Sequence, residues 1–232
     1  GLGLTAISVA TGNSATCALL SDHSVKCWGK NNLGQLGLGN TSSNDVLTPH
    51  TVTFNGASTP LSVHAGRNEF CAQLDNGSAA CWGQNADGQF GLGNTTSQTS
   101  PIALTLPTGR TIASMSLAKD FICMTLDNGS VVCAGRNTES QIGQGTTSTA
   151  ELSWKYVVGL DMVAHSVGLG QDVGCAHLVN GSMVCWGEDV WGFFGNSASS
   201  YTWRSATTAS EYVDFGDDRT AASISVNYRH AC

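Results

Sequence analysis

One spacing of cysteines constrains this chain more than any other feature of its sequence. Four times, a cysteine is followed ten residues later by another, giving the pairs Cys17 and Cys27, Cys71 and Cys81, Cys123 and Cys133, and Cys175 and Cys185. Cys232 stands where a fifth pair would begin, and the five first cysteines lie 54, 52, 52 and 57 residues apart. A period of this length indicates a repeat architecture in which each copy forms one small structural unit.

The ten-residue spacing predicts a disulfide-bridged β-hairpin in every copy. If Cys71 and Cys81 face each other on antiparallel strands, residues 75–77 form a three-residue loop. Such a loop ends on a residue with positive φ, which suits glycine in copies two to four and is tolerated by His23 in copy one. The cysteines then fall at a non-hydrogen-bonded pair, where Cα atoms come within about 4.5 Å. We therefore predict four bridges: Cys17–Cys27, Cys71–Cys81, Cys123–Cys133 and Cys175–Cys185.

Two other roles for the cysteines fit the sequence less well. Zinc sites use pairs two to four residues apart with a second pair nearby, and this chain lacks that spacing. Four facing pairs of free thiols are less favoured than four bridges. Each bridge would close an 11-residue loop, worth about 2.5 to 3 kcal/mol in the chain-entropy model.

Each copy also has the pattern of four short strands. An apolar residue lies eight positions before every first cysteine, within an alternating segment, at Val9, Val63, Met115, Val167 and Ile224. Alternation of this kind is typical of a half-buried strand. The hairpin follows, and then a glycine-rich turn, a Thr/Ser-rich linker and a less regular strand. Four strands in about 53 residues is the size of one propeller blade.

The motifs resemble those of a known family. Copies one and two contain Cys17-Ala18-Leu19, Cys27-Trp28-Gly29 and Gly34-Gln35-Leu36-Gly37, and Cys71-Ala72, Leu74, Cys81-Trp82-Gly83 and Gly88-Gln89-Phe90-Gly91. This pattern resembles the regulator of chromosome condensation repeat, whose family forms seven-bladed β-propellers. Copy three has Ala134 in place of tryptophan, and copy four has a degraded turn at 192–195.

The resemblance implies an all-β fold, a β-propeller of four-stranded blades of about 52–57 residues, with four repeats and the start of a fifth. We place the repeats at about 5–58, 59–110, 111–162 and 163–219, with a partial one at 220–232, in a single propeller, or part of one, over 1–232. Seven blades need a longer chain. Cys232 is therefore paired in a longer protein, bonded to another subunit or a free thiol, and the half-repeat also suits a strand donated to a neighbouring chain.

Composition and charge limit the classes of partner and the cellular compartment that we expect. The net charge is −7 and only 12% of residues are charged, which disfavours nucleic acid and anionic membranes as partners. Paired cysteines at this density predict an oxidising location, so we expect a secreted, extracellular or cell-surface protein. No apolar stretch reaches membrane-spanning length, and the first residues do not form a signal peptide, so we expect a processed chain.

The remaining motifs favour structural roles over catalysis. The glycine turns lack the Lys and Ser/Thr of a phosphate loop. Trp28, Trp82 and Trp186 recur at one offset in the repeat, which predicts packing between blades rather than a stacking platform for sugars or bases. The six histidines lack metal-ligand spacing, the turn at 85–88 has too few carboxylates for calcium, and no nucleophile motif occurs. We expect no enzymatic activity, no cofactor and no metal.

Two sets of residues are candidates for contacts outside the chain. N-glycosylation sequons occur at Asn40, Asn76, Asn94, Asn128 and Asn180. Asn40 and Asn94 are the first candidates, because turn geometry alone explains the other three. Four aromatic residues lie off the repeat offsets and are candidate partner contacts: Trp154, Trp191, Tyr201 and Trp203.

We therefore expect a non-catalytic extracellular structural or adhesive β-propeller, as a subunit of a cell-surface assembly or filament. Its partners would be proteins, including copies of itself. The alternative is a secreted protein-binding propeller, similar to bacterial members of the family that inhibit β-lactamases. A remote alternative is guanine-nucleotide exchange, as in the nuclear founder of the family. That role needs a reducing compartment, which conflicts with the cysteine pairs.

Overall fold

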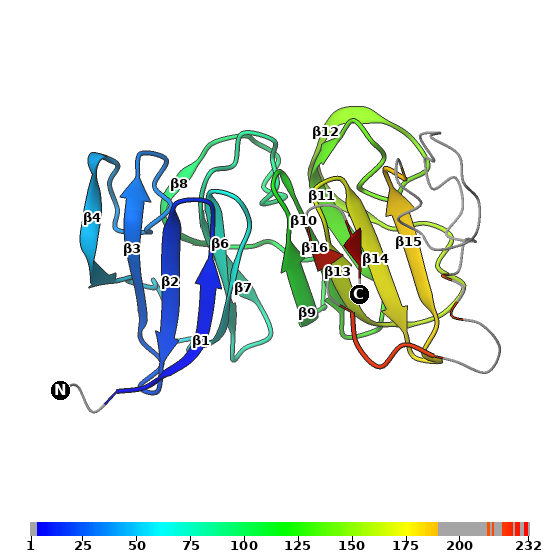
Figure 1. The fold of residues 1–232 in the computed structure, drawn as a ribbon, viewed down its shortest axis with the longest axis horizontal. Helices are drawn as coiled ribbons and strands as arrows, with labels where there is room; N and C mark the ends of the chain where they lie inside the picture. The colour runs from blue at the N-terminus through cyan, green and yellow to red at the C-terminus, as the bar shows by residue number, and fades with distance from the viewer. Residues whose placement is uncertain are drawn as a thin grey trace. The chain divides into compact units, whose positions relative to one another are not determined.

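The computed structural model describes residues 4–189, 213, 215, 220–224, 226, 227, 230 and 231. The described residues form β-strands and turns, without a helix. They group into two compact units, one of residues 1–86 and 94–106, the other of residues 87–93 and 107–232. Figure 1 shows that the strands of each sheet follow one another in chain order.

The first unit contains two four-stranded antiparallel sheets. The sheet of the first repeat has the order β1 (Ala6–Thr11), β2 (Ala15–Leu20), β3 (Val25–Asn31) and β4 (Ser42–Thr51). That of the second repeat has the order β5 (Pro60–Ala65), β6 (Glu69–Leu74), β7 (Ala79–Gly83) and β8 (Gln98–Ala103). Each sheet is a simple meander, the strand order of a propeller blade.

The second unit repeats this pattern. Its first sheet consists of β9 (Ile112–Leu117), β10 (Phe121–Leu126), β11 (Val131–Asn137) and β12 (Ser148–Tyr156). The described strands of the next sheet are β13 (Ala164–Leu169), β14 (Val173–Leu178) and β15 (Met183–Gly187). A short pair, β16 (Val226–Asn227) and β17 (His230–Ala231), comes from the partial fifth copy.

The hairpin loops have the geometry that the ten-residue spacing predicts. Cys71 pairs with Cys81 across β6 and β7, and the amide of Gly77 donates to the carbonyl of Leu74 at 3.0 Å. Gly77 has a φ of 78°, and His23 takes the same conformation with a φ of 64°. The predicted register and the predicted positive-φ positions are therefore confirmed.

Each unit has a core between its successive sheets. In the first unit, one apolar cluster includes Leu19, Leu36, Val63, Phe70 and Trp82. In the second unit, the corresponding cluster includes Phe121, Ile142, Val167 and Trp186. Strand β10 is buried at all six residues, so its side chains face apolar surroundings on both sides of the sheet. This explains why the central strands consist of Cys, Ala, Phe, Ile and Met rather than alternating polar residues.

Candidate docking site between repeats

The four hairpins are each joined by a disulfide. The bridges are Cys17–Cys27, Cys71–Cys81, Cys123–Cys133 and Cys175–Cys185, and the Cα atoms lie 4.1 Å apart in the first three and 4.0 Å apart in the fourth. All eight sulfur-bearing residues are buried. Each bridge therefore ties the two central strands of a blade together inside the core.

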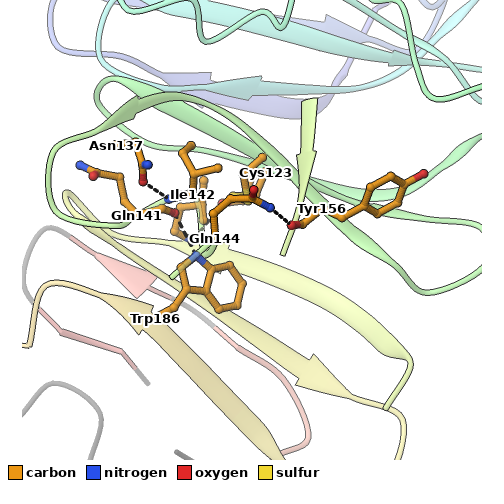
Figure 2. The surroundings of a disulfide bond; sticks show 10 residues. Cys123, Asn137, Gln141, Ile142, Gln144, Tyr156 and Trp186 are labelled. Atoms are coloured by element: carbon orange, nitrogen blue, oxygen red, sulfur yellow. Dashed lines mark hydrogen bonds between the residues drawn. A yellow bond between two sulfur atoms is a disulfide. The ribbon is translucent and has the colours of Figure 1, made fainter. Parts of the chain in front are cut away.

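A buried asparagine at the end of the third strand shapes the glycine turn. The side-chain oxygen of Asn137 accepts from the amide of Ile142 at 3.2 Å, as Figure 2 shows, and its side-chain nitrogen donates to the carbonyl of Thr146 at 2.9 Å. Asn31 binds Leu36 and Asn40 in the same way at 3.1 Å. The sequence contained the signal for this role, an asparagine four residues after the second cysteine in copies one to three.

The turn lies on a tryptophan of the following repeat. The indole nitrogen of Trp82 donates to the carbonyl of Gln35 at 3.1 Å. In the second unit the indole of Trp186 donates to the carbonyl of Gln141 at 2.9 Å (Figure 2). We call the surface on which the turn lies, formed by the indole and the strand residues around it, a seat. The apolar residue of the turn, Leu36 or Ile142, is fully buried there.

The last glycine of the turn is required by this contact. Gly37 has a φ of 68°, and a Cβ placed on it would come 3.0 Å from an indole carbon of Trp82. Gly143, with a φ of 73°, stands in the same position over Trp186. A larger residue would be strained in its backbone and would also press on the indole.

The third repeat builds its seat from a different strand. Its β11 has Ala134 where Trp82 and Trp186 stand, and Trp154 of β12 takes over the contact. A Cβ on Gly91 would come 2.4 Å from the Trp154 ring. We interpreted Trp154 from the sequence as a partner contact, which stays a prediction; in the structure its side chain is half-buried and lies against the turn. Its buried indole nitrogen has no hydrogen-bond partner among the described residues.

The first repeat has a seat without a turn on it. Trp28 is only half-buried, whereas Trp82 and Trp186 are fully buried. Val9 is 57% exposed, whereas its equivalents Val63 and Val167 are 5% and 6% exposed. The prediction that all three tryptophans pack between blades therefore holds for Trp82 and Trp186, and Trp28 differs.

Charged side chains gather at one end of the third repeat. Asp120 lies 3.1 Å from the ammonium of Lys119 and 3.6 Å from the guanidinium of Arg136. Burial, with the nearby Asp120 carboxylate as the second cause, raises the pKa of Asp87 above its ordinary value. Among the described residues, no three His, Cys, Asp or Glu side chains form a group that could hold a metal ion. The cluster mixes both charge signs and suits polar contacts with a protein.

A shallow groove lies beside the hairpin loop of the third repeat. It has a volume of about 340 Å³ and lies between residues 128–131 and the connector at 156–163. Tyr156, Met162 and Val163 line it and are exposed, and Asp161 supplies a carboxylate. Figure 2 shows the side chain of Gln144 donating to the Tyr156 carbonyl. Sequence reasoning missed this groove because one of its two sides is a connector, residues 156–163, that does not repeat.

The structure shows the exposure of some of the remaining predicted site residues. The sequon asparagines are all exposed: Asn40, Asn76, Asn94, Asn128 and Asn180. Trp191, Tyr201, Trp203 and Cys232 lie outside the described residues. No helix in the described part of the chain is long and apolar enough to cross a membrane.

Comparison with known sequences identifies the repeat. Residues 6–35, 22–72 and 76–124 match the regulator of chromosome condensation (RCC1) repeat. The protein RCC2 homolog of Xenopus laevis is 31% identical over 146 residues, which cover 62% of this chain and 28% of that protein. The chain thus matches less than a third of the length of this curated relative.

Solved structures share the fold. Human WBSCR16 has a TM-score of 0.81 at 19% identity, over 97% of this chain and 58% of that one. The CRINKLY WD40 ectodomain of the Arabidopsis thaliana receptor kinase ACR4 has a TM-score of 0.56 at 17% identity, over 99% of this chain and 63% of that one. At these identities the likeness shows the fold alone.

Proposed function

This chain belongs to the regulator of chromosome condensation repeat family, and from that premise we propose that it is a non-catalytic, extracellular β-propeller. It works as a structural or adhesive subunit by binding other proteins. The observation that carries the proposal is the buried disulfide in each of the four hairpins. Such bridges persist in oxidising compartments and are reduced in the cytosol and nucleus.

The bridges support a durable scaffold. Each closes a short loop between neighbouring strands, so it stabilises one hairpin whatever the state of the others. An exposed protein that must keep its shape outside the cell gains from this independence. The structure of the ACR4 receptor-kinase ectodomain is a precedent for this fold outside the cell.

The surface supports protein partners. The net charge of −7 disfavours nucleic acid, and the charges at Lys119, Asp120 and Arg136 are paired with one another. The exposed sequon asparagines leave room for glycans, which we propose for Asn40 and Asn94 first. Blades held by buried bridges present such a surface rigidly, which lowers the entropic cost of binding.

The test is the location and thiol state of the natural protein. Material from its source would be alkylated before lysis and mapped by peptide mass spectrometry with and without reduction. We expect surface labelling of intact cells, or recovery from the medium, and four hairpin-linked peptide pairs. Free thiols at all eight positions, in an intracellular fraction, would contradict the proposal.

A second candidate function is favoured by the groove at Tyr156, Met162 and Val163. An exposed groove that places Tyr156, Met162 and Val163 beside one carboxylate and the polar hairpin residues 128–130 suits a soluble partner that inserts a side chain there, as in a secreted inhibitor of another enzyme. We expect that a β-lactamase inhibited by the purified protein would escape inhibition when Met162 is changed to aspartate. Equal inhibition by the Met162→Asp variant would remove the groove from this role.

A further inference from the structure

The connector that leads into the fourth repeat carries a group of exposed apolar side chains. Tyr156, Met162 and Val163 line the groove of the third repeat. Val179 lies beside Val163, because its amide donates to the Val163 carbonyl at 3.0 Å. The four side chains are between 39% and 60% exposed. We call Tyr156, Met162, Val163 and Val179 the connector patch.

The same positions are polar or small where the chain enters the second and third repeats. The backbone fixes the alignment, since the amide of Asp75 donates to the carbonyl of Thr59 and that of Asp127 to the carbonyl of Thr111, both at 2.9 Å. The equivalents of the connector patch are Thr51, Ser58, Thr59 and Asp75 for the second repeat, and Ala103, Arg110, Thr111 and Asp127 for the third. The apolar surface is therefore a property of this connector and is not required by the fold.

The fourth repeat also gives up a hydrogen bond to make this surface. The amide of Thr59 donates to the Asp75 carboxylate at 3.0 Å, and the amide of Thr111 donates to the Asp127 carboxylate at 3.2 Å. Val179 has no side-chain oxygen that could accept such a bond. Single exposed apolar residues are ordinary, but a group of them around a groove marks an interaction site. A partner that covers the connector patch explains why these residues are apolar.

The charge of the groove indicates what kind of partner fits. Asp161 is exposed and is the only charged residue among those that line the groove. The neighbouring Asp127 is paired with Arg110 at 3.4 Å. Asp161 forms no ion pair with any residue that the structure describes. Its carboxylate attracts a cation from outside the chain.

The groove also has the surfaces that a long basic side chain uses. Figure 2 shows the Tyr156 ring pointing away from the turn residues and Trp186, so its face is open to a cation. Met162 and Val163 offer apolar contact to the methylene stem of lysine or arginine. A Cβ on Gly129 would collide with Val163, so Val163 packs closely on the hairpin loop. The volume of about 340 Å³ is small for a ligand site and suits one side chain.

We propose that the connector patch binds a basic side chain, arginine or lysine, which a protein partner presents between apolar residues. The cationic group lies between the carboxylate of Asp161 and the ring of Tyr156. The apolar neighbours of the basic residue cover Met162, Val163 and Val179. The inference names the chemistry of the partner and rests on the proposed protein-binding role.

The experiment is a titration of the purified, disulfide-bonded chain followed by its backbone amide NMR signals. The probes are the peptides acetyl-Leu-Arg-Leu-amide and acetyl-Leu-Gln-Leu-amide, which differ in the charged residue alone. We expect saturable shifts at residues 128–131, 156–163 and 179. The arginine peptide should bind about tenfold more tightly than the glutamine peptide, because it gains an ion pair and a cation–π contact.

Two variants separate the contributions of charge and apolar contact. Asp161→Asn should weaken the arginine peptide about three- to fivefold and leave the glutamine peptide unchanged. Glu151→Gln is the matched control, since Glu151 is paired with Lys155 at 3.6 Å and does not line the groove.

The double variant Val163→Thr with Val179→Ser tests the apolar contact. It introduces the residues of the first repeat, where the amide of Thr5 donates to the Ser21 hydroxyl at 3.3 Å, so it should fold normally. Both peptides should bind it more weakly and by the same factor. Unchanged amide signals outside the connector serve as the folding control.

Three results would overturn the inference. The first is equal affinity for the two peptides, and the second is the absence of saturable shifts at the connector patch. The third is concentration-dependent broadening of these signals without peptide, which would make the patch a contact between copies of the chain. None of them bears on the extracellular role, which depends on disulfides and location. A protein with free thiols inside the cell could still bind arginine through this patch, so the two proposals fail separately.

Discussion

We call the contact between a glycine turn and the indole of the following repeat a joint. The joint in the first unit uses different residues from the joint that residues 87–93 form in the second unit. In the first, Trp82 comes from the third strand of its blade, stacks on Phe70 with ring centroids 6.2 Å apart, and donates to the carbonyl of Gln35. In the second, Trp154 comes from the fourth strand, is half-buried, and has a buried indole nitrogen with no hydrogen-bond partner in the part of the chain that the structure describes. What the repeats retain is an aromatic ring under a left-handed glycine, whichever strand supplies the ring.

The comparison also predicts an energetic difference. The first joint has a fully buried indole, an aromatic neighbour and a hydrogen bond, whereas the indole of the second makes no hydrogen bond to any described residue. A buried donor without a partner costs about 1–3 kcal/mol. The joint at Trp154 should therefore be the weaker one.

The largest effect is expected for Trp82→Ala. Removing a fully buried indole that packs on Leu36 and Phe70 should lower the free energy of unfolding by about 3–5 kcal/mol. Urea unfolding followed by intrinsic fluorescence measures it. Trp28→Ala is the control, since Trp28 has the same repeat position without a turn on it and should cost far less. Equal losses would mean that the turn adds nothing to the seat.

Removing a disulfide should lower the free energy of unfolding by the same amount in both regions. Changing Cys71 and Cys81 together to alanine should lower the free energy of unfolding by about 2.5 to 3 kcal/mol, because the loop closed is short. Cys123 and Cys133 close a loop of the same length, so their double variant should match. A clear difference between the two double variants would show that hairpin rigidity, rather than the indole, accounts for the difference in strength between the two joints.

Trp154→Ala should cost less than Trp82→Ala, on the order of 2 kcal/mol, because the side chain is half-buried and its removal also eliminates an unsatisfied donor. Trp154→Phe sharpens the test, since it keeps the ring over Gly91 and deletes the nitrogen. We expect it to be neutral or slightly stabilising in the same urea experiment. A loss as large as that of Trp82→Ala would refute the ranking of the joints.

The smallest effect is a dependence on pH in the first unit. Burial holds the pKa of His64 below its ordinary value of 6.5 in the folded protein. The unfolded chain then binds the proton more readily, so the stability contributed by neutral His64 is present above pH 6.5 and is lost as the pH falls below it. His64→Gln should flatten the pH dependence of the melting temperature in this window. A His64→Gln variant with the same pH dependence as the wild type would contradict this assignment.

The sequence alone predicted the features that depend on short-range geometry. The cysteine spacing and the glycine at 77 determine a hairpin register, because a three-residue loop leaves few alternatives. Strand periodicity placed Val63 and Val167 in the core, where both are buried. The recurrence of Trp82 and Trp186 at one offset correctly indicated packing between blades.

Features that depend on the neighbouring repeat could not be predicted in the same way. Trp28 and Trp82 have the same local sequence, and they differ because a turn covers one and leaves the other open. Trp154 lies off the repeat offset. Its contact with the turn can be inferred only after noticing that Ala134 replaces the tryptophan that the other repeats have at this position. The missing tryptophan at 134 and the extra one at 154 were the available signal.

The most direct test of the central claim, that glycine turns on indoles hold the repeats together, is a double-mutant cycle between Leu36 and Trp82. These residues belong to different repeats and meet in one apolar cluster. The free energies of unfolding of Leu36→Ala, Trp82→Ala and the double variant give their coupling. We predict a coupling energy of about 1 kcal/mol or more, in the range of residues in contact. Additive losses, with a coupling energy near zero, would contradict the account.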